Sequence, residues 1–482
     1  MSRFKSEALT FTQERENFES SFVQTKCSIF QNFYHSYLLS VYKTLVLPNS
    51  SILELGCGSG KLLFGLNPNR GVGVDFSSKY QNQFNDDCGE NFILICADAH
   101  KVRFGDEKFD YIILSDLVND LWDIQEVLLA IQNASHPHTK IILNFRSHLW
   151  SYPLLLANKL GWARPTLRQN WVTRADIVNL LEISNFQPLK VWTDYLCPIP
   201  LGGISRFFNR YLAKLWPFNI FNLINFVIAR PLPVEGIKNH VPSDLSVSII
   251  IAARNESGHI SELLERIPEM GSWIEVIFVE GGSSDDTYLK IESEMSKRPG
   301  KFKLLKQSGK GKGDAVRLGF DNASGDILMI LDADITVPPE DLVRFYNLLN
   351  NGSAEFVNGV RLVYPMEDDA MRFLNLVGNK FFSSAFTWLL GQPIRDTLCG
   401  TKALKRTDYE KISMNRSYFG EFDPFGDFDL LFGAARMNLK IQEVPIRYRA
   451  RRYGETNISR WSHGWLLLKM VLYAAKRIKF TP

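Results

Sequence analysis

Short apolar runs alternate with segments of helical periodicity along most of the chain. The runs are rich in Val, Ile and Leu, and turn residues and a helical pattern follow each of them, as expected of buried parallel strands. This alternation predicts an α/β fold in both halves of the chain. The runs occupy residues 51–55, 71–75, 92–98, 109–116, 247–253, 275–280 and 327–331.

Residues 229–246 interrupt this alternation. They are rich in Pro, Gly and polar residues and show no periodicity, which is typical of a linker. A chain of 482 residues is also long enough for two domains, each with its own core. We therefore expect a first domain at 1–230, a linker at 231–245 and a second domain at 246–482. Within the first domain, residues 8–47 have a helical pattern and are expected to form a lid or a flank.

The first apolar run leads into a glycine-rich turn before a helix. Gly56, Gly58 and Gly60 let the backbone pass close to a ligand, and the following helix offers free N–H groups. Lys61 stands where a dinucleotide fingerprint would have its third glycine, which argues against NAD. Asp75 ends the next run, about twenty residues on, and is suited to binding ribose hydroxyls.

These residues, together with Asp98 at the end of the third run, resemble the class I S-adenosylmethionine-dependent methyltransferases over residues 50–145. The resemblance implies a Rossmann-like fold and S-adenosylmethionine as a cofactor. It places Asp98 beside the adenine edge. The residues implied in cofactor binding are Glu54, Gly56, Gly58, Gly60, Asp75 and Asp98.

The methyl acceptor is not indicated by any motif. The Asn/Asp-Pro-Pro-Tyr run of amino-group methylases that act on nucleic acids is absent, and no cysteine stands in a recognisable nucleophile setting. Residues 144–190 are expected to cover the acceptor pocket. Their Trp, His and Arg residues could equally pack in the domain or lie at the rim of the pocket. His148 is better explained as a structural or surface histidine. A non-catalytic binding or scaffold role for this half stays open.

Composition narrows the class of protein. The formal net charge is +3, which gives no general case for binding nucleic acid. The six cysteines are scattered without Cys-x-x-Cys pairs, so we expect reduced thiols in a cytoplasmic protein, with neither zinc nor disulfides required. We expect no secretion signal, because the first residues lack an apolar stretch, and no spanning helix.

In the second half, residues 325–341 combine an apolar strand with two carboxylates one residue apart, Asp332 and Asp334. A strand end of this kind can hold Mg²⁺ or Mn²⁺, and the cation can neutralise charge on the diphosphate of a nucleotide-sugar leaving group. The alternative is a solvated turn after a core strand, and Asp-x-Asp alone favours that alternative.

Several further motifs surround this strand in a fixed order. An Arg-Asn-Glu run follows the strand at 247–253, a Glu-Gly-Gly-Ser-Ser-Asp run follows the strand at 275–280, and a glycine-spaced basic loop, 310–314, can approach phosphates. In this order the motifs resemble family 2 glycosyltransferases with a GT-A fold, over residues 246–460. The resemblance is strongest to the dolichyl- and polyprenyl-phosphate sugar transferases.

This resemblance implies a role for each motif. Residues implied in binding the nucleotide-sugar donor are Arg254, Asn255, Glu256, Glu280, Asp285, Lys310, Lys312 and Asp332, and the implied metal ligands are Asp332 and Asp334. Residues implied at the acceptor are Arg361, Asp396, Gly400, Arg451, Arg452 and Thr456. The residues implied in catalysis are Asp334, Asp427, Asp429 and Arg451. Arg451 and Arg452 could instead be solvated surface charges.

The sequence departs from the family pattern at three positions. Glu280 replaces the first acid of Val-Asp-Asp-Gly-Ser, and Gly281 replaces the second, so one usual nucleotide contact is missing. Thr336 stands where the lipid-phosphate enzymes often have Gln, which puts a third side-chain ligand to the metal in doubt. Processive polysaccharide synthases are excluded, because their Gln-x-x-Arg-Trp motif and channel helices are absent.

Two segments suggest peripheral contact with a membrane. Residues 370–392 are aromatic and amphipathic, and the tail from Arg447 carries many cations against a single acid, Glu455. A basic helix with tryptophans suits an anionic membrane surface, although a C-terminal helix that packs on the core would look similar.

We therefore expect a bifunctional enzyme at the cytoplasmic face of a membrane. Its second domain would transfer a sugar from a UDP- or GDP-linked donor to a polyprenyl or dolichyl phosphate, with inversion. Its first domain would transfer a methyl group to an acceptor that the sequence does not identify. The alternative is transfer to a hydroxyl group of a glycolipid or secondary metabolite, with Asp427 or Asp429 as general base. The sequence does not predict the oligomeric state.

Overall fold

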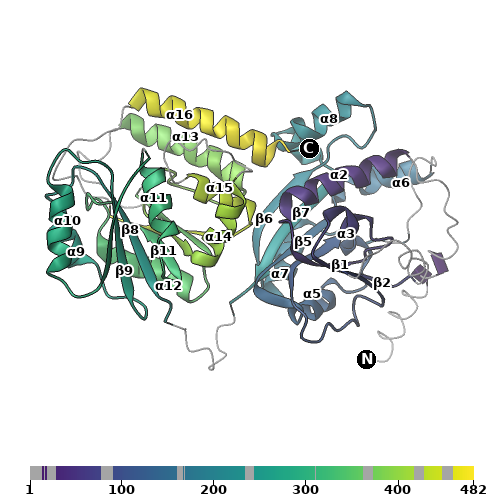
Figure 1. Ribbon diagram of the computed structural model, residues 1–482. Helices are drawn as coiled ribbons and strands as arrows, with labels where there is room; N and C mark the ends of the chain where they lie inside the picture. Colours follow the sequence, from purple (N-terminus) through teal and green to yellow (C-terminus); the bar gives the residue numbers. More distant parts are fainter. Residues whose placement is uncertain are drawn as a thin grey trace. The chain divides into compact units, whose positions relative to one another are not determined.

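Two compact units make up the chain, one formed by Met1–Leu232 with Phe480–Pro482 and the other by Pro233–Lys479 (Figure 1). The computed structural model describes residues 14–15, 17–18, 29–77, 91–159, 167, 169–233, 244–309, 311–361, 373–416, 428–447 and 460–481. Most of the predicted linker therefore lies outside the described residues. Within the described residues each unit contains one seven-stranded sheet.

The sheet of unit 1 has the order β3-β2-β1-β4-β5-β7-β6. Neighbours from β3 to β5 are parallel, and β7 is antiparallel to both β5 and β6. The strands are β1 (Ser51–Leu55), β2 (Arg70–Asp75), β3 (Phe92–Cys96), β4 (Phe109–Ser115), β5 (Ser135–Arg146), β6 (Phe186–Asp194) and β7 (Ile224–Pro231). The helices are α2 (Ile29–Leu45), α3 (Lys61–Leu66), α5 (Ile124–Gln132), α6 (Ser151–Lys159), α7 (Arg174–Ile183) and α8 (Gly203–Arg210).

Both faces of this sheet are covered, which explains why its central strands are apolar throughout. Leu53 of β1 packs in a cluster with Val127 of α5 and Ile177 of α7. Ile52, its neighbour, points to the opposite face and packs with Tyr42 of α2. Alternate side chains of one strand thus enter two separate cores.

One part of the predicted linker is wrong. Residues 229–231 complete β7, where Pro231 pairs with Phe186 at the end of the ladder. A proline is tolerated at a strand end because no further ladder hydrogen bond depends on its missing N–H.

The sheet of unit 2 has the order β10-β9-β8-β11-β13-β12-β14. Only β13 runs antiparallel to its neighbours, β11 and β12, among the described pairings. The strands are β8 (Val247–Ala253), β9 (Ile274–Glu280), β10 (Lys301–Lys306), β11 (Ile327–Ile330), β12 (Phe356–Val360), β13 (Lys402–Lys405) and β14 (Ile441–Pro445). The helices are α9 (Ile260–Arg266), α10 (Thr287–Ser296), α11 (Lys312–Asp321), α12 (Leu342–Asn350), α13 (Phe373–Leu390), α14 (Arg406–Met414), α15 (Phe428–Arg436) and α16 (Arg460–Ala474).

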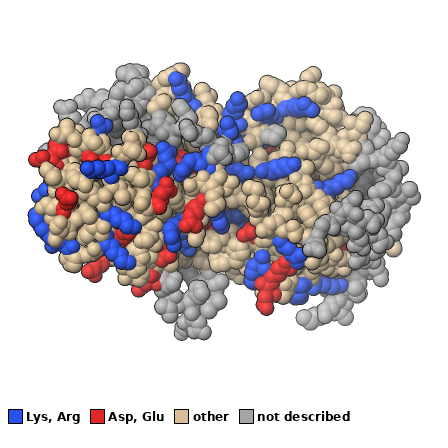
Figure 2. Space-filling view, viewed as in Figure 1, with Lys and Arg blue, Asp and Glu red and all other residues tan. Residues whose placement is uncertain are grey.

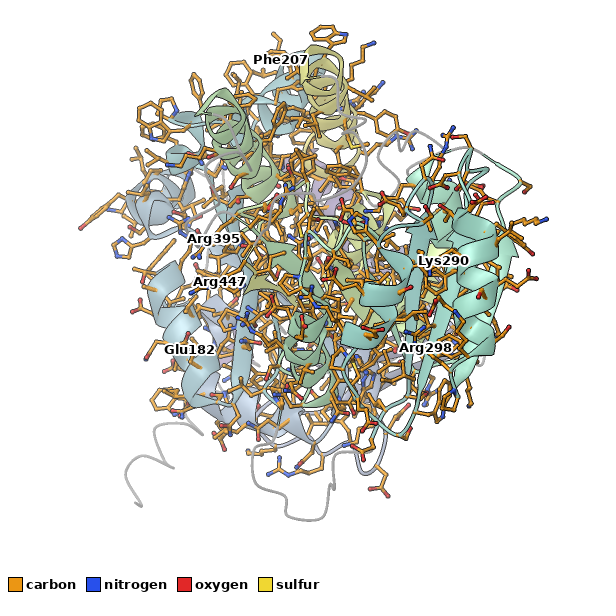
Figure 3. All side chains as sticks on the ribbon, turned by 90° about the vertical axis from the view of Figure 1, so that its left-hand side faces the viewer. Glu182, Phe207, Lys290, Arg298, Arg395 and Arg447 are labelled. Carbon is orange, nitrogen blue, oxygen red and sulfur yellow. The ribbon has the colours of Figure 1, made fainter. Side chains whose placement is uncertain are left out.

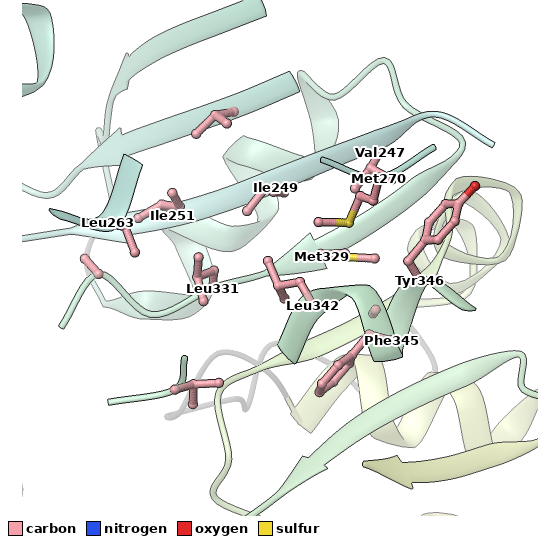
Figure 4. Packing of buried hydrophobic residues seen from close by; sticks show 14 of the residues in the cluster. Val247, Ile249, Ile251, Leu263, Met270, Met329, Leu331, Leu342, Phe345 and Tyr346 are labelled. Atoms are coloured by element: carbon pink, nitrogen blue, oxygen red, sulfur yellow. The ribbon is translucent and has the colours of Figure 1, made fainter. Parts of the chain in front are cut away.

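The core of unit 2 forms where β8 and β11 meet α12. Ile249 and Met329 pack with Leu342 and Phe345, all fully buried (Figure 4). Burying side chains of this size contributes about 1.5–3 kcal/mol each. This core holds the ends of β8 and β11 rigidly side by side, and both strands end at the same edge of the sheet.

The two segments predicted to contact a membrane form α13 and α16, which pack on each other. Met470 and Ala474 on α16 are fully buried, whereas Trp465 and Leu472 are exposed. The C-terminal helix therefore packs on the core with one face and leaves the other to solvent. No helix among the described residues is long and apolar enough to cross a membrane.

Candidate active sites

The glycine turn of unit 1 lies at the point where the strand order reverses, between β1 and β4. Ligands bind at such switch points, outside the carboxyl ends of the strands. Gly56, Gly58 and Gly60 all have positive φ, at 71°, 52° and 67°. A Cβ on Gly56 would also lie 2.8 Å from Leu117 Cδ1. The turn therefore requires glycine both for its backbone conformation and for close packing.

Two buried carboxyl groups brace this turn. Asp75 accepts a hydrogen bond from the Gly58 N–H at 2.8 Å and another from the Ser77 N–H at 2.9 Å. Glu54 accepts from the N–H of Leu63, in the first turn of α3, at 3.1 Å. Burial, with a smaller contribution from the Asp75 charge, raises the pKa of Glu54 to about 8. Both acids predicted from the sequence thus lie at one cradle of backbone N–H groups.

Asp98 is held in place by a neighbouring histidine. Its Oδ1 contacts His100 Nδ1 at 2.7 Å, and His100 Nε2 accepts from the Asp123 N–H at 3.2 Å. That second contact leaves the proton on Nδ1, so the histidine donates to Asp98. The hydrogen bond from His100 lowers the pKa of Asp98.

A fourth acid, Asp116, follows β4 and was not among the predicted site residues. It has a positive φ of 55° and accepts from Tyr34 Oη at 2.8 and 2.9 Å and from Asn144 Nδ2 at 2.7 Å. Burial, opposed by the charge of Arg146, raises the pKa of Asp116. Its place at a strand end was visible in the sequence, but its partner Tyr34 on α2 is 82 residues away. His148, by contrast, is exposed and packs edge-on to Trp171.

In unit 2, β8 lies between β9 and β11 and runs parallel to both of them. The strand order reverses at β8. The loops after β8 and β9 are joined by hydrogen bonds. The Asn255 N–H donates to Ser283 Oγ at 3.0 Å, and Asn255 Oδ1 accepts from the Ser284 N–H at 2.8 Å. Asn255 adopts a positive φ of 57°, a conformation that asparagine tolerates. Arg254, beside it, is exposed.

The acids of these loops also hold backbone N–H groups. Glu280 accepts from the Ser283 N–H at 2.5 Å, and Asp285 accepts from the Thr287 N–H at 3.0 Å. Burial would raise the pKa of Glu280, but hydrogen bonds from Ser283 and Gly282 and the Lys306 charge lower it overall. Glu256 is buried and contacts His259 Nδ1 at 2.8 Å.

Asp332 and Asp334 follow β11 and have different surroundings. Asp332 pairs with Lys312, the first residue of α11, whereas Asp334 accepts from Thr336 Oγ1 at 2.7 Å. Burial would raise the pKa of Asp332, but the charges of Lys312, Lys402 and Arg361 lower it. Burial and the Asp332 charge raise the pKa of Asp334.

The backbone around Asp332 and Asp334 has one residue with a positive φ and one glycine in close contact with the pair. Ile335 lies between Asp334 and Thr336 with a φ of 56°, which is strained for a β-branched residue. Gly400 faces the ion pair so closely that a Cβ there would overlap Lys312 Nζ and Asp332 Oδ2. Gly400, which is predicted at the acceptor, leaves room for the Asp332 ion pair.

Arg361 and Asp396, both predicted at the acceptor, contact each other. Arg361 Nε and Nη2 donate to the two carboxylate oxygens of Asp396 at 2.7 and 2.8 Å. Asp396 is fully buried, and burial would raise its pKa, but the Arg361 partner lowers it. Sequence reasoning missed Lys402, a buried lysine on β13 that donates to the Cys399 carbonyl and lies near Asp332.

Asp429, at the start of α15, lies between two arginines that the sequence did not single out. Its Oδ2 is 3.3 Å from Arg416 Nε and 3.7 Å from Arg317 Nη1. The remaining predicted site residues lie outside the described residues: Lys310, Asp427, Arg451, Arg452 and Thr456. Among the described residues there is no group of three or more His, Cys, Asp or Glu side chains that could hold a metal ion.

Comparison with known proteins identifies the class of each unit. Residues 52–138 match the family model for a methyltransferase domain, and residues 248–413 match that for glycosyl transferase family 2. The chain joins a methyltransferase domain to a family 2 glycosyltransferase domain. The predicted fold class is confirmed by these matches and by the two sheets.

The chain is similar to several curated glycosyltransferases of archaea. It is 28% identical over 238 residues to glycosyltransferase AglJ of Haloferax volcanii, covering 49% of this chain and 74% of that protein. It is 29% identical over 222 residues to dolichol-phosphate mannosyltransferase of Pyrococcus furiosus, covering 44% of this chain and 59% of that protein. It is 28% identical over 227 residues to a dolichyl-phosphate hexose transferase of Haloferax volcanii, covering 47% of this chain and 92% of that protein.

Proposed function

We propose that unit 2 transfers a sugar, with inversion, from a UDP- or GDP-linked donor to a polyprenyl or dolichyl phosphate at the cytoplasmic face of a membrane. The observation that carries this proposal is the charge pattern around Asp332. Two carboxylates stand at the switch point of a parallel sheet, and Lys312, Lys402 and Arg361 act on one of them. Such a site suits a diphosphate, and the names of the similar proteins supply the lipid-phosphate acceptor.

The residues present fit a hard divalent cation. Mg²⁺ and Mn²⁺ need only one or two carboxylates when the substrate phosphates and water complete the coordination. Burial and the charge of the nearby Asp332 carboxylate raise the pKa of Asp334, and a cation would relieve the repulsion between the two carboxylates. When bound, the cation would neutralise charge on the leaving diphosphate. Asp332 and Asp334 are the residues that would hold it.

The surroundings of Asp429 favour a phosphate acceptor over a hydroxyl acceptor. A hydroxyl needs a free carboxylate that takes its proton, whereas Asp429 Oδ2 lies 3.3 Å from Arg416 Nε and 3.7 Å from Arg317 Nη1, so this carboxylate contacts two cations. A phosphate monoester has a second pKa of about 6, so it is already an anionic nucleophile near neutrality. It needs cations to bind it, and Arg317 and Arg416 add two cations to those predicted.

Two variants separate these acceptors. Arg451→Ala should raise the apparent KM for polyprenyl phosphate strongly, and Asp429→Asn should lower turnover by about tenfold or less, against about 10²–10⁴-fold for loss of a general base. Lys411→Ala, an exposed cation on α14, is the matched control. Transfer would be measured with radiolabelled nucleotide sugars and purified lipid phosphate. If Asp429→Asn loses about three orders of magnitude while Arg451→Ala is nearly silent, the acceptor is a hydroxyl.

We also propose that unit 1 binds S-adenosylmethionine and transfers its methyl group to an acceptor still to be identified. The cradle of Gly58 and Ser77 N–H groups around Asp75 supports this proposal. Bound S-adenosylmethionine supplies an already activated methyl group, so the protein needs mainly to position the acceptor. Calorimetric titration of the chain tests it. Absence of binding would favour a scaffold role for unit 1.

A further inference from the structure

Helix α8 of unit 1 is amphipathic, but it buries its polar side and exposes its apolar side. The side chains that face the protein are polar, since Ser205 is fully buried and Asn209 is only 2% exposed. The side chains that face outward are apolar, since Ile204, Phe207 and Phe208 are 60%, 53% and 37% exposed. Figure 3 labels Phe207. Surface helices normally bury the apolar side and expose the polar one.

The inward orientation is set by specific hydrogen bonds. Asn209 accepts from the Cys197 N–H at 2.7 Å and donates to the Cys197 carbonyl at 2.9 Å. Ser205 accepts from the Leu201 N–H at 3.1 Å. Ser205 and Asn209 lie one helical turn apart, so together they tie the helix to the preceding loop. The helix cannot turn its aromatic face inward without leaving these buried groups unsatisfied.

The apolar surface continues beyond the helix. Trp216 is 80% exposed and Phe221 is 60% exposed, and both belong to the short turns that follow α8. Between Asp194 and Glu235 the sequence contains no acidic residue, while Arg206 is exposed beside the aromatic side chains. Figure 2 shows basic and uncharged side chains over this segment. An exposed apolar patch of this kind marks an interaction site.

We propose that this α8 surface, residues 199–221, binds the interface of an anionic lipid bilayer. Aromatic rings enter the headgroup region of a bilayer, and neighbouring cations bind anionic lipids. Helix α8 has only eight residues, too few to span a membrane, so it would lie in the interface plane. A protein partner is a weaker explanation, because a patch without acids pairs its positive charge best with a uniformly anionic surface.

Within unit 1 the surface is separate from the glycine turn. It follows β6, an edge strand of the sheet, whereas the glycine turn lies between β1 and β4 near the centre. The proposal therefore goes beyond the proposed function and does not depend on which acceptor receives the sugar. It gives the methyltransferase half its own contact with the membrane, in addition to any contact by α13 and α16.

Vesicle binding by the full chain tests the proposal. Wild-type protein should cosediment with vesicles of phosphatidylcholine and phosphatidylglycerol, and less with phosphatidylcholine alone. Phe207→Ser combined with Trp216→Ser should weaken binding by about tenfold or more, because each ring contributes over 1 kcal/mol when buried. Arg206→Ala should weaken binding only to the anionic vesicles. Leu289→Ser, at an equally exposed leucine of unit 2, is the matched control.

Several outcomes would overturn the proposal. One is unchanged vesicle binding by the double variant, and another is loss of binding only in Trp465→Ser/Leu472→Ser on α16. A third is a change of oligomeric state by the double variant without lipid, which would make this face a contact between copies of the chain. Thermal unfolding would confirm that the variant folds. Transfer to a short-chain, detergent-soluble lipid phosphate reports on the proposed function separately.

Discussion

Both units place acids at the switch point of a parallel sheet, but they surround these acids differently. In unit 1, Glu54 and Asp75 lie close together, and their oxygens accept hydrogen bonds from backbone N–H groups. In unit 2, Asp332 pairs with Lys312 and is influenced by Lys402 and Arg361. The acids of unit 1 are thus held by backbone N–H groups, whereas Asp332 of unit 2 is held by cationic side chains.

This difference matches the charges of the proposed ligands. S-adenosylmethionine carries a sulfonium and an ammonium group against one carboxylate, so its site does not require added cations beside the acids. A nucleotide diphosphate sugar is an anion, so carboxylates near it are tolerated only together with cations or a metal ion. Under the proposed functions, the same fold position would serve ligands of different charge because different side chains surround it.

The largest effect is expected when a carboxylate of the proposed metal site in unit 2 is removed. Asp334→Ala should reduce sugar transfer by about 10²–10³-fold or more, since the charge of the leaving diphosphate is then no longer neutralised. Binding of S-adenosylmethionine should be unchanged. Asp341→Asn, on the nearby Pro339–Asp341 turn, is the control. Full transfer activity in EDTA, or in the Asp334 variant, would contradict the metal assignment.

A smaller effect is expected from Gly400→Ala. The added methyl group would overlap Lys312 Nζ and Asp332 Oδ2, so the ion pair must separate. We expect sugar transfer to fall by about tenfold, with a raised KM for the donor. Gly378→Ala, where the added carbon meets nothing within 4 Å, is the control and should retain activity. Equal activities of the two variants would mean that the ion pair is dispensable.

In unit 1, Asp75→Ala should weaken binding of S-adenosylmethionine by about tenfold or more. The variant loses the acceptor for ribose hydroxyls and also the hydrogen bond that holds the Gly58 N–H. Calorimetry measures the affinity, and sugar transfer should be unaffected. Asp75→Asn, which keeps the shape, guards against a folding defect, and exposed Asp106→Asn is the control. Wild-type affinity in both Asp75 variants would remove this acid from the site.

The last predicted effect is of another kind and concerns stability and pH. The pKa of Glu54 is about 8 in the folded chain, against an ordinary value of 4.5. The folded state therefore keeps a proton that the unfolded state loses, so the stability of unit 1 should fall as pH rises between these values and level off above pH 8. The slope is at most about 1.4 kcal/mol per pH unit.

Glu54→Gln should remove this slope, and Asp106→Asn should keep it. Urea unfolding at a series of pH values, followed through the transition that S-adenosylmethionine shifts, measures the effect. A slope that survives in Glu54→Gln would assign the pH dependence to another group. Asp332 offers the contrast, because its neighbouring cations lower its pKa.

Much of the fold could be predicted from the chain alone. The strands have short apolar runs and the switch-point acids follow them directly, so Asp75, Glu280, Asp332 and Asp334 could be named from local pattern. Partners from distant segments could not. Tyr34 contacts Asp116 across 82 residues, and Asp429 is approached by Arg317 on α11 and by Arg416, which follows α14. Local patterns carry no information about which loops the sheet brings together.

Gly400 and α8 show the same division. The sequence determined that residue 400 is a glycine in a turn, but only the tertiary structure decided that its missing side chain makes room for the Lys312–Asp332 pair. Residues 203–210 form a helix with one polar and one apolar side. The sequence did not decide which side faces the protein, because periodicity is the same for either orientation. The hydrogen bonds of Ser205 and Asn209 to the loop at 197–202 made that choice, and they left Phe207 facing outward.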